Sequence, residues 1–123
     1  MHDAEDREST EQGRALVVMS DDRVALATVL VLQEMDLRVD VAIDGSAAVG
    51  WAGRDEYEVI VCGPDGSAAD LALRFVEAAP GARVMLLGGA DDSEWELGAK
   101  GVDVIRPPLN VNTLVRRFWP AAA

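Results

Sequence analysis

The sequence contains few of the cysteine and histidine residues on which metal, redox and many catalytic sites depend. It contains one cysteine, Cys62, and one histidine, His2, among its 123 residues. A single cysteine excludes an intrachain disulfide and any paired-cysteine metal or redox motif. We expect Cys62 to be a small core residue of a strand, and His2 to be exposed to solvent near the chain end.

Basic residues and long apolar runs are also scarce. The chain has 11 lysines and arginines against 22 acidic residues, which gives a formal net charge of −11 at pH 7. This charge opposes binding to nucleic acids and to anionic lipid surfaces. The longest strongly apolar segment, Val24–Leu32, is too short to span a bilayer, and the first residues lack the basic-then-apolar pattern of a signal peptide. We therefore expect a cytoplasmic protein that binds neither nucleic acid nor membranes.

The length of the chain fits a single domain. Residues 1–14 carry five acids, two bases and no apolar periodicity. We predict a mobile acidic arm there, followed by one domain over residues 15–119 and a short tail over residues 120–123.

Apolar strand patterns and helical patterns alternate five times along this domain. Strands are predicted over 15–19, 39–43, 57–62, 83–87 and 102–105, and helices over 24–35, 47–54, 68–79, 94–99 and 110–119. Such alternation predicts a parallel sheet covered on both faces by right-handed crossovers. The predicted fold is therefore α/β, a three-layer flavodoxin-like (βα)5 sandwich whose five-stranded parallel sheet has the order 2-1-3-4-5.

The stretch from Tyr57 to Gly66 gives the strongest local signal. An apolar run rich in β-branched residues ends abruptly in Gly-Pro-Asp-Gly, which predicts a central strand buried on both faces and followed by a turn. Ligands of open α/β sheets bind outside the carboxyl ends of the central strands. Chemistry is therefore expected at residue 63 and its neighbours.

This stretch resembles the third strand of the receiver domains of bacterial response regulators, in which Tyr-Asp and four apolar residues lead to the aspartate that accepts a phosphoryl group. Residues 37–45 resemble the second receiver strand with its Asp-Gly exit. Leu97-Gly98-Ala99-Lys100-Gly101 resembles the turn before the fifth strand, and Arg106-Pro107 stands where Lys-Pro is usual. The resemblance covers residues 15–119 and implies a role in two-component signal transduction.

The residues that perform receiver chemistry are replaced. Receivers use two adjacent acids that hold Mg²⁺, the acceptor aspartate, a Ser or Thr, and a lysine. Counting along this chain places the acidic pair on Met19 and Ser20, or on Ser20 and Asp21. It places the acceptor on Gly63, the hydroxyl on Gly88 and the lysine on Arg106. We therefore predict a stand-alone pseudo-receiver that is not an enzyme, binds no metal or cofactor, and acts through phosphorylation-independent protein–protein interaction.

Two alternatives remain open at the level of sequence. Asp65 follows Gly63 by two residues and could act as a displaced phosphoacceptor, with Asp21 and Asp22 near a metal. Alternatively, Gly63, Gly88 and Gly89 leave a recess in which Arg106 attracts an anion or small ligand. The simpler interpretations are that Asp65 is a turn residue, and that Asp21 and Asp22 cap and begin a helix.

The first helix is apolar nearly all round. Val24, Ala27, Thr28, Val31, Leu32 and Met35 trace one predicted inner face, whereas Leu26, Val29 and Leu30 lie off it with Ala25. We predict that Leu26, Val29 and Leu30 form an interface together with Phe118 and Trp119 of the last helix. Its occupant would be a signalling partner or a second copy of the chain. The alternative is that neighbouring chain covers these side chains.

Overall fold

The computed structural model describes residues 13–63, 68–88 and 94–105. Most of the predicted arm, Asp65, Arg106 and the whole of the predicted last helix and tail lie outside this part of the chain. The described elements are β1 (Arg14–Val18), α2 (Asp22–Glu34), β2 (Arg38–Ala42), α3 (Gly45–Arg54), β3 (Val59–Cys62), α4 (Ala68–Ala78), β4 (Arg83–Leu87), α5 (Glu94–Ala99) and β5 (Val102–Ile105).

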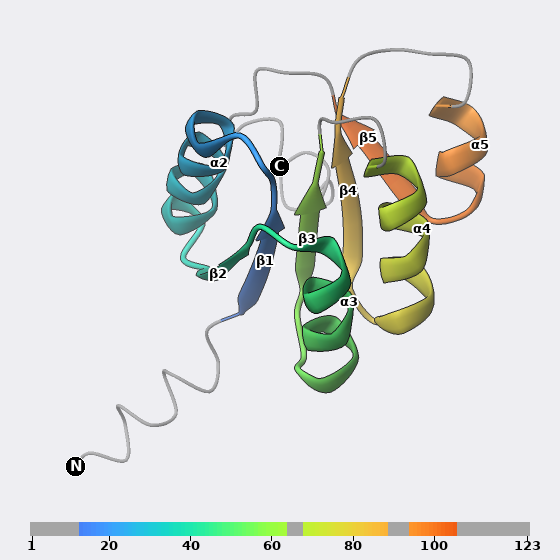
Figure 1. The fold of residues 1–123 in the computed structure, drawn as a ribbon, viewed down its shortest axis with the longest axis horizontal. Coiled ribbons are helices and arrows are strands. Elements are labelled where there is room, and N and C mark those ends of the chain that lie inside the picture. The colour runs from blue at the N-terminus through green and yellow to red at the C-terminus, as the bar shows by residue number, and fades with distance from the viewer. Residues whose placement is uncertain (1–12, 64–67, 89–93, 106–123) are drawn as a thin grey trace.

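The five strands form one parallel sheet in the order β2-β1-β3-β4-β5 (Figure 1). This confirms the predicted three-layer fold. Every residue of β3 is buried, as expected for a central strand with helices on both faces. Val18 of β1 pairs with Cys62 of β3, and Cys62 pairs with Leu86 of β4. The carboxyl ends of these three strands therefore meet at one edge of the sheet.

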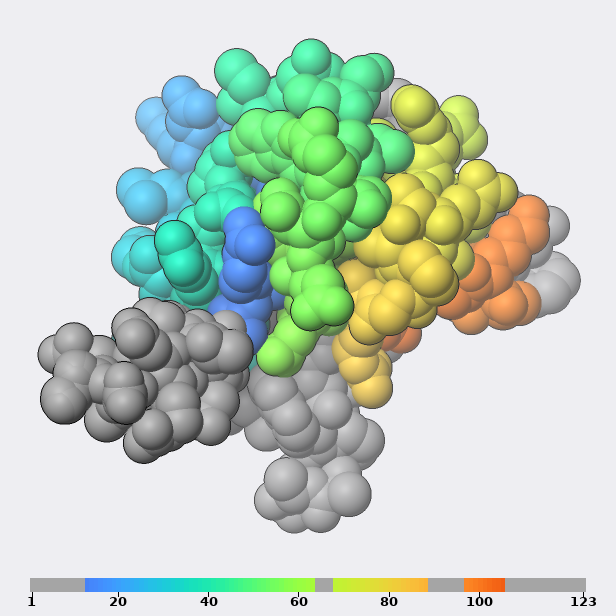
Figure 2. Space-filling model, turned by 90° about the horizontal axis from the view of Figure 1, so that it is seen from below, coloured from blue at the N-terminus to red at the C-terminus, as the bar shows by residue number. Residues whose placement is uncertain are grey.

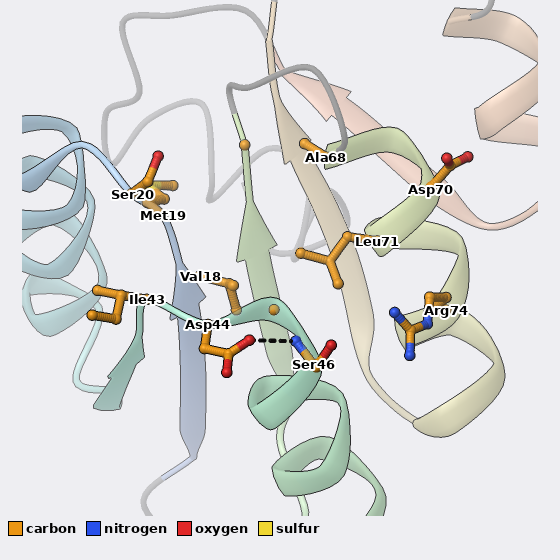
Figure 3. A pocket seen from close by; sticks show the side chains of 12 residues that line it. Val18, Met19, Ser20, Ile43, Asp44, Ser46, Ala68, Asp70, Leu71 and Arg74 are labelled. Carbon is orange, nitrogen blue, oxygen red and sulfur yellow. Dashed lines mark hydrogen bonds between the residues drawn. The ribbon is translucent and has the colours of Figure 1, made fainter.

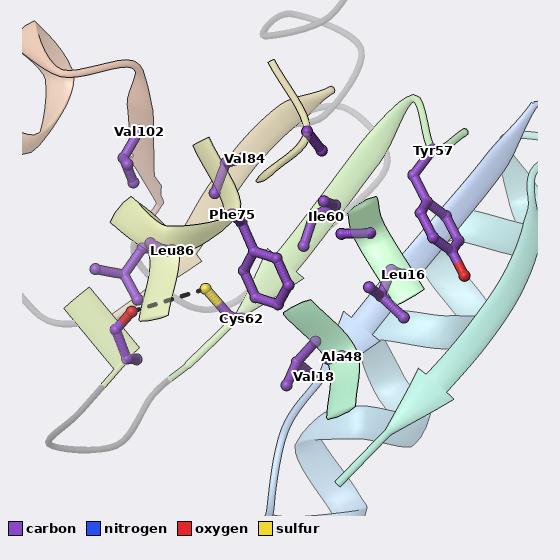
Figure 4. Close-up of a cluster of buried hydrophobic side chains, with 14 of the residues drawn as sticks. Leu16, Val18, Ala48, Tyr57, Ile60, Cys62, Phe75, Val84, Leu86 and Val102 are labelled. Carbon is purple, nitrogen blue, oxygen red and sulfur yellow. Dashed lines mark hydrogen bonds between the residues drawn. The ribbon is translucent and has the colours of Figure 1, made fainter. Parts of the chain in front are cut away.

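The sheet separates two apolar cores. Alternate strand residues such as Leu16, Ile60 and Val84 pack with Phe75 of α4 and Ala48 of α3 in one core (Figure 4). The other core contains Val17, Val61 and Met85 and is covered by α2. Cys62 is fully buried in the first core, so the prediction of a core cysteine is confirmed.

Several element boundaries differ from the sequence prediction. β1 begins at Arg14, one residue earlier than expected, because Arg14 pairs with Arg38 at the start of β2. Tyr57 lies before β3 rather than in it. α3 begins at Gly45 rather than Ala47, because the Asp44 side chain accepts a hydrogen bond from the Ser46 N–H and caps the helix.

The buried face of α2 is rotated from the predicted one. Ala25, Thr28 and Leu32 are the buried residues of this helix, whereas Ala27, which was predicted to face inward, is exposed. Ala25 was predicted to face outward, which is wrong. The spacing of three and four residues between Ala25, Thr28 and Leu32 gives one stripe, and this stripe fits against the strands of the second core.

On α4, Ala72 is buried and Leu71 is only partly buried. Among the described helices, none is long and apolar enough to cross a membrane.

Candidate functional site

Met19 occupies the first position at which the receiver resemblance places a metal-holding acid. It follows β1 directly and is 2% exposed. Its sulfur lies 3.6 Å from the Thr28 hydroxyl, which itself donates to the Val24 carbonyl at 2.8 Å. Met19 therefore belongs to the core under α2 and supplies no hard oxygen ligand for a divalent cation.

Asp21 and Asp22 serve the start of α2. The Asp21 carboxylate accepts hydrogen bonds from the backbone N–H groups of Arg23 at 2.9 Å and Val24 at 3.2 Å. Asp22 follows as an exposed acid in the first turn. An Asp at the N-cap satisfies N–H groups that the helix cannot pair internally. Asp21 thus has the capping role that the sequence offered as one of two alternatives.

Gly63 stands where the receiver resemblance places the acceptor, and its backbone leaves no room for a side chain. Its φ is +110°. A Cβ atom built on Gly63 would lie 2.3 Å from the Leu87 carbonyl oxygen and 3.0 Å from the Leu86 Cδ1. Residues with a Cβ rarely adopt this backbone conformation. An aspartate at this position would therefore require the end of β3 to move away from β4.

Gly88, at the position of the receiver hydroxyl, differs from Gly63. A Cβ on Gly88 would meet no atom within 4 Å, and the Gly88 N–H donates to the Ile105 carbonyl at 3.0 Å. A serine or threonine would fit there, yet the chain has glycine. Asp65 and Arg106, the remaining predicted site residues, lie outside the described residues.

A cavity of about 320 Å³ opens at the carboxyl ends of the strands beside Gly63 (Figure 3). Its floor includes Met19, Ser20 and Gly63, and its walls come from the loop before α3 and the first turns of α4. Its polar side chains are the hydroxyls of Ser20 and Ser46, the carboxylates of Asp44 and Asp70, and the Arg74 guanidinium.

This set of side chains limits the chemistry of the cavity. Within residues 13–63, 68–88 and 94–105, no three histidine, cysteine or acidic side chains converge as metal ligands would. The Asp44 carboxylate already accepts the Ser46 N–H at 3.0 Å (Figure 3). Hydroxyls and one arginine can hold a polar ligand, but the described lining offers no nucleophile at the position of Gly63.

A polar network at the opposite end of the sheet was not predicted from the sequence. The Asp40 carboxylate accepts from the Arg14 guanidinium at 2.7 Å and from the Tyr57 hydroxyl at 2.8 Å. The Arg14 guanidinium carbon also lies 4.9 Å from the centre of the Tyr57 ring, within the range of a cation–π contact. Figure 2 looks at this end and shows the start of β1, in blue, between β2 and the green segment before β3. The sequence pattern instead places Arg14 in the arm and Tyr57 in the strand.

Burial and mutual hydrogen bonding shift the titration of this network. Burial and the hydrogen bond to Asp40 raise the pKa of Tyr57 to about 12. Burial alone would raise the pKa of Asp40, but the hydrogen bonds from Tyr57 and Arg14 outweigh it and hold that pKa below its ordinary value. The hydrogen bond to Asp40 likewise raises the pKa of Arg14. The network is therefore ionised at Arg14 and Asp40 and neutral at Tyr57 around pH 7.

The residues of the predicted interface separate into three groups. Leu26 and Leu30 are 60% and 54% exposed. Val29 is partly buried and packs against the core under α2, so it is turned further inward than Leu26 and Leu30. Phe118 and Trp119 lie outside the described residues.

Comparison with families of known proteins finds no matching family model, and comparison with curated proteins finds no match either. Solved structures do match. A CheY-like response regulator receiver domain from Methanospirillum hungatei has a TM-score of 0.74 and 18% identity, with 90% of this chain and 94% of that chain covered.

Two further structures give the same result. An orphan response regulator of H. pylori has a TM-score of 0.72 and 16% identity, over 90% of this chain and 97% of that one. A response regulator from Burkholderia pseudomallei, described with a phosphorylated aspartic acid, a calcium ion and citrate, has a TM-score of 0.71 and 20% identity. This match covers 85% of this chain and 65% of the other. With identities this low, the likeness concerns the fold alone, and the chain therefore has the CheY-like, flavodoxin-type fold found in receiver domains.

Proposed function

We propose that this protein is a receiver-like module of two-component-type signal transduction that works through protein–protein interaction and without phosphorylation. The observation that carries the proposal is the backbone at Gly63, with φ at +110° and no space for a Cβ beside the Leu87 carbonyl. Loss of an aspartate alone could be reversed by one substitution. Here, however, the backbone at the end of β3 lies so close to β4 that only glycine fits at position 63, so a single substitution would not restore the aspartate.

The surroundings of Gly63 support the same proposal. Phosphoryl transfer to a carboxylate needs the carboxylate nucleophile and a cation that neutralises the phosphoryl oxygens. Buried Met19 stands where one metal-holding acid is expected, and Asp21 is engaged with the N–H groups of α2. Neither residue is available to hold Mg²⁺ in the described arrangement.

A module of this kind acts by presenting a surface to another protein. The rigid sheet fixes the helices, and exposed apolar side chains on them supply contact area. Leu26 and Leu30 on α2 are such side chains. We expect the partner to be a cytoplasmic signalling protein, a second copy of the chain, or both in turn.

A second candidate function rests on the cavity beside Gly63. Its volume of about 320 Å³ and its lining by Ser20, Ser46 and Arg74 suit a small polar ligand or anion. A ligand that binds only the folded state raises the melting temperature. A thermal-shift screen with phosphate and nucleotides, repeated on Arg74→Gln, tests this function, because binding at this cavity must depend on Arg74.

The main proposal is tested by titrating the isotopically labelled protein with Mg²⁺ and beryllofluoride, a mimic of the phosphoryl group, and following the amide resonances of Gly63 and Gly88. We expect no saturable change below millimolar Mg²⁺. Asp21→Asn is the matched control, because an asparagine retains the helix cap but removes the charge. Saturable beryllofluoride binding that Asp65→Asn abolishes would instead establish the displaced-acceptor alternative.

A further inference from the structure

The large apolar side chains that are exposed in the described part of the chain lie on α2 and along β2. Leu26 and Leu30 are joined by Val41, which is 46% exposed, and Ile43, which is 78% exposed. We call these four residues the edge patch. α2 packs on β1 and β2 and runs antiparallel to β2, so its Leu26 end lies beside the Ile43 end of the strand. Figure 3 shows Ile43 on the side of the strand ends that faces α2.

β2 is an edge strand, and half of its backbone groups point away from the sheet. The Arg38 N–H donates to the Gly13 carbonyl at 2.8 Å, so Arg38 faces β1. In a parallel pair the backbone direction alternates along the strand. Val39 and Val41 therefore direct their N–H and C=O groups outward, where no described strand pairs with them. Such an edge with exposed apolar side chains is a template for a further strand.

The geometry points to a second copy of this chain as the occupant of that edge. We propose that two β2 strands pair antiparallel across a twofold axis at Val41, joining two five-stranded sheets into one. A twofold interface uses the same surface on both subunits, and β2 meets this requirement because its outward-facing residue Val41 can pair with the partner's Val41. The inference concerns a surface away from Gly63 and does not depend on whether that position takes phosphate.

In this register, apolar residues lie opposite each other on one face of the joined sheet, and oppositely charged residues lie opposite each other on the other face. On the α2 face, Val39 lies opposite the partner's Ile43. On the other face, Arg38 lies opposite the partner's Asp44, which gives a complementary ion pair on each side of the axis. Centring the pairing on Asp40 instead would place two carboxylates opposite each other, which is unfavourable.

The helix positions fit the same arrangement. Strands in a sheet lie about 4.8 Å apart. The twofold axis lies midway between the two β2 strands, half a spacing from each, so the midpoint between β1 and β2 lies one full spacing, about 4.8 Å, from the axis. Since α2 packs over this pair of strands, the two α2 helices would lie about 10 Å apart, close to the distance of packed helices. Leu26 and Leu30 would then fill the space between the helices.

Charge distinguishes a second copy from another partner. Two chains of net charge −11 repel each other, and salt screens this repulsion. Self-association should therefore strengthen with ionic strength, whereas binding of a basic protein to the edge patch would weaken. Sedimentation of the full chain at low and high salt is the first measurement, and we expect a monomer–dimer equilibrium that shifts toward the dimer at high salt.

Cysteine cross-linking tests the register. Val41→Cys places two thiols opposite each other at the axis, within disulfide reach, and the only native cysteine, Cys62, is buried. Ala99→Cys, an exposed position at the end of α5, is the matched control. We expect rapid disulfide-linked dimers from Val41→Cys and none above background from Ala99→Cys. Equal rates for both variants, or a wild type that is monomeric at every salt and protein concentration, would overturn the proposal.

A second variant tests the edge patch itself. Leu26→Gln with Leu30→Gln keeps good helix formers at exposed positions and should weaken the dimer at least about tenfold, with an unchanged circular dichroism spectrum. Undiminished dimerisation of a folded double variant would contradict the role of α2. If the double variant unfolds, the Val41→Cys result decides.

Discussion

At the scale of single residues, Gly63 and Gly88 show how two glycines at the same edge of the sheet can differ. The receiver resemblance places a reactive or phosphate-binding side chain at both positions. Gly63 has a positive φ and a carbonyl oxygen in the place of its Cβ, whereas Gly88 has open space. The backbone conformation and the neighbouring strand therefore require glycine at position 63, whereas the surroundings of Gly88 would accept a side chain.

Gly63→Ala should destabilise the protein by about 2–4 kcal/mol, because it combines a disfavoured φ with a clash in a packed interior. Gly88→Ala is the matched control and should change the free energy of unfolding by less than about 0.5 kcal/mol. Urea unfolding of the two variants measures both values. Equal effects would mean that the end of β3 relaxes freely, which would remove the structural barrier to an aspartate there.

The ionisation of Tyr57 can be measured directly, because Tyr57 is the only tyrosine in the chain, and it reports on the buried network of Arg14, Asp40 and Tyr57. Its ordinary pKa of 10.0 is raised to about 12 in the folded protein. The folded state holds the phenolic proton more tightly than the unfolded state does. This contribution to stability is complete below pH 10 and is lost as the pH rises from 10 toward 12.

We expect the absorbance of tyrosinate to rise with a midpoint near pH 12 in native protein and near pH 10 in urea. Asp40→Asn, which removes the negative charge next to the hydroxyl, should lower the native midpoint. A native midpoint at pH 10 with the circular dichroism spectrum intact would show that Tyr57 is neither buried nor bonded to Asp40.

At the scale of elements, the start of α2 shows that an acid near the strand-end cavity can have a purely local role. Asp21→Ala should lower the free energy of unfolding by about 1 kcal/mol, because two N–H groups lose their acceptor. Asp22→Ala should cost less, since Asp22 contributes only its charge near the helix dipole. Chemical unfolding provides the comparison, and a larger loss at Asp22 would reject the capping role of Asp21.

The order and type of the described elements could be predicted because the signals are local. β4, α5 and β5 have the predicted bounds, since apolar runs there end at glycine or charged residues. The ends of β1 and β3 differ because pairing decides them. Arg14 joins the sheet through its register with Arg38, which no pattern within residues 1–14 reveals.

The candidate site was predictable in its position but not in its geometry. Counting along the chain placed Gly63 at the acceptor position, but its closeness to Leu87 depends on how β4 lies against β3. The face of α2 was misjudged because apolar residues surround the helix and give its period little contrast. The network of Arg14, Asp40 and Tyr57 joins residues 26 and 17 positions apart, and no sequence signal marked it.

At the scale of the whole molecule, the two ends of the sheet carry different chemistry. The carboxyl ends of the strands meet at a cavity beside Gly63, without a nucleophile at that position. The amino ends carry a bonded Arg14–Asp40–Tyr57 network that ties β1, β2 and the segment before β3 together. A fold can persist while the chemistry of its usual site changes, and we propose that this chain combines the receiver-type fold with a strand-end site that takes no phosphoryl group.

Whether the strand-end site takes up a phosphoryl group is tested most directly by the intact mass of the protein after incubation with acetyl phosphate and Mg²⁺. We predict the mass of the unmodified chain at every incubation time, because position 63 carries no carboxylate and buried Met19 stands where the resemblance places a metal-holding acid. Stoichiometric addition of one phosphoryl group, lost on replacement of a single aspartate such as Asp65, would contradict it.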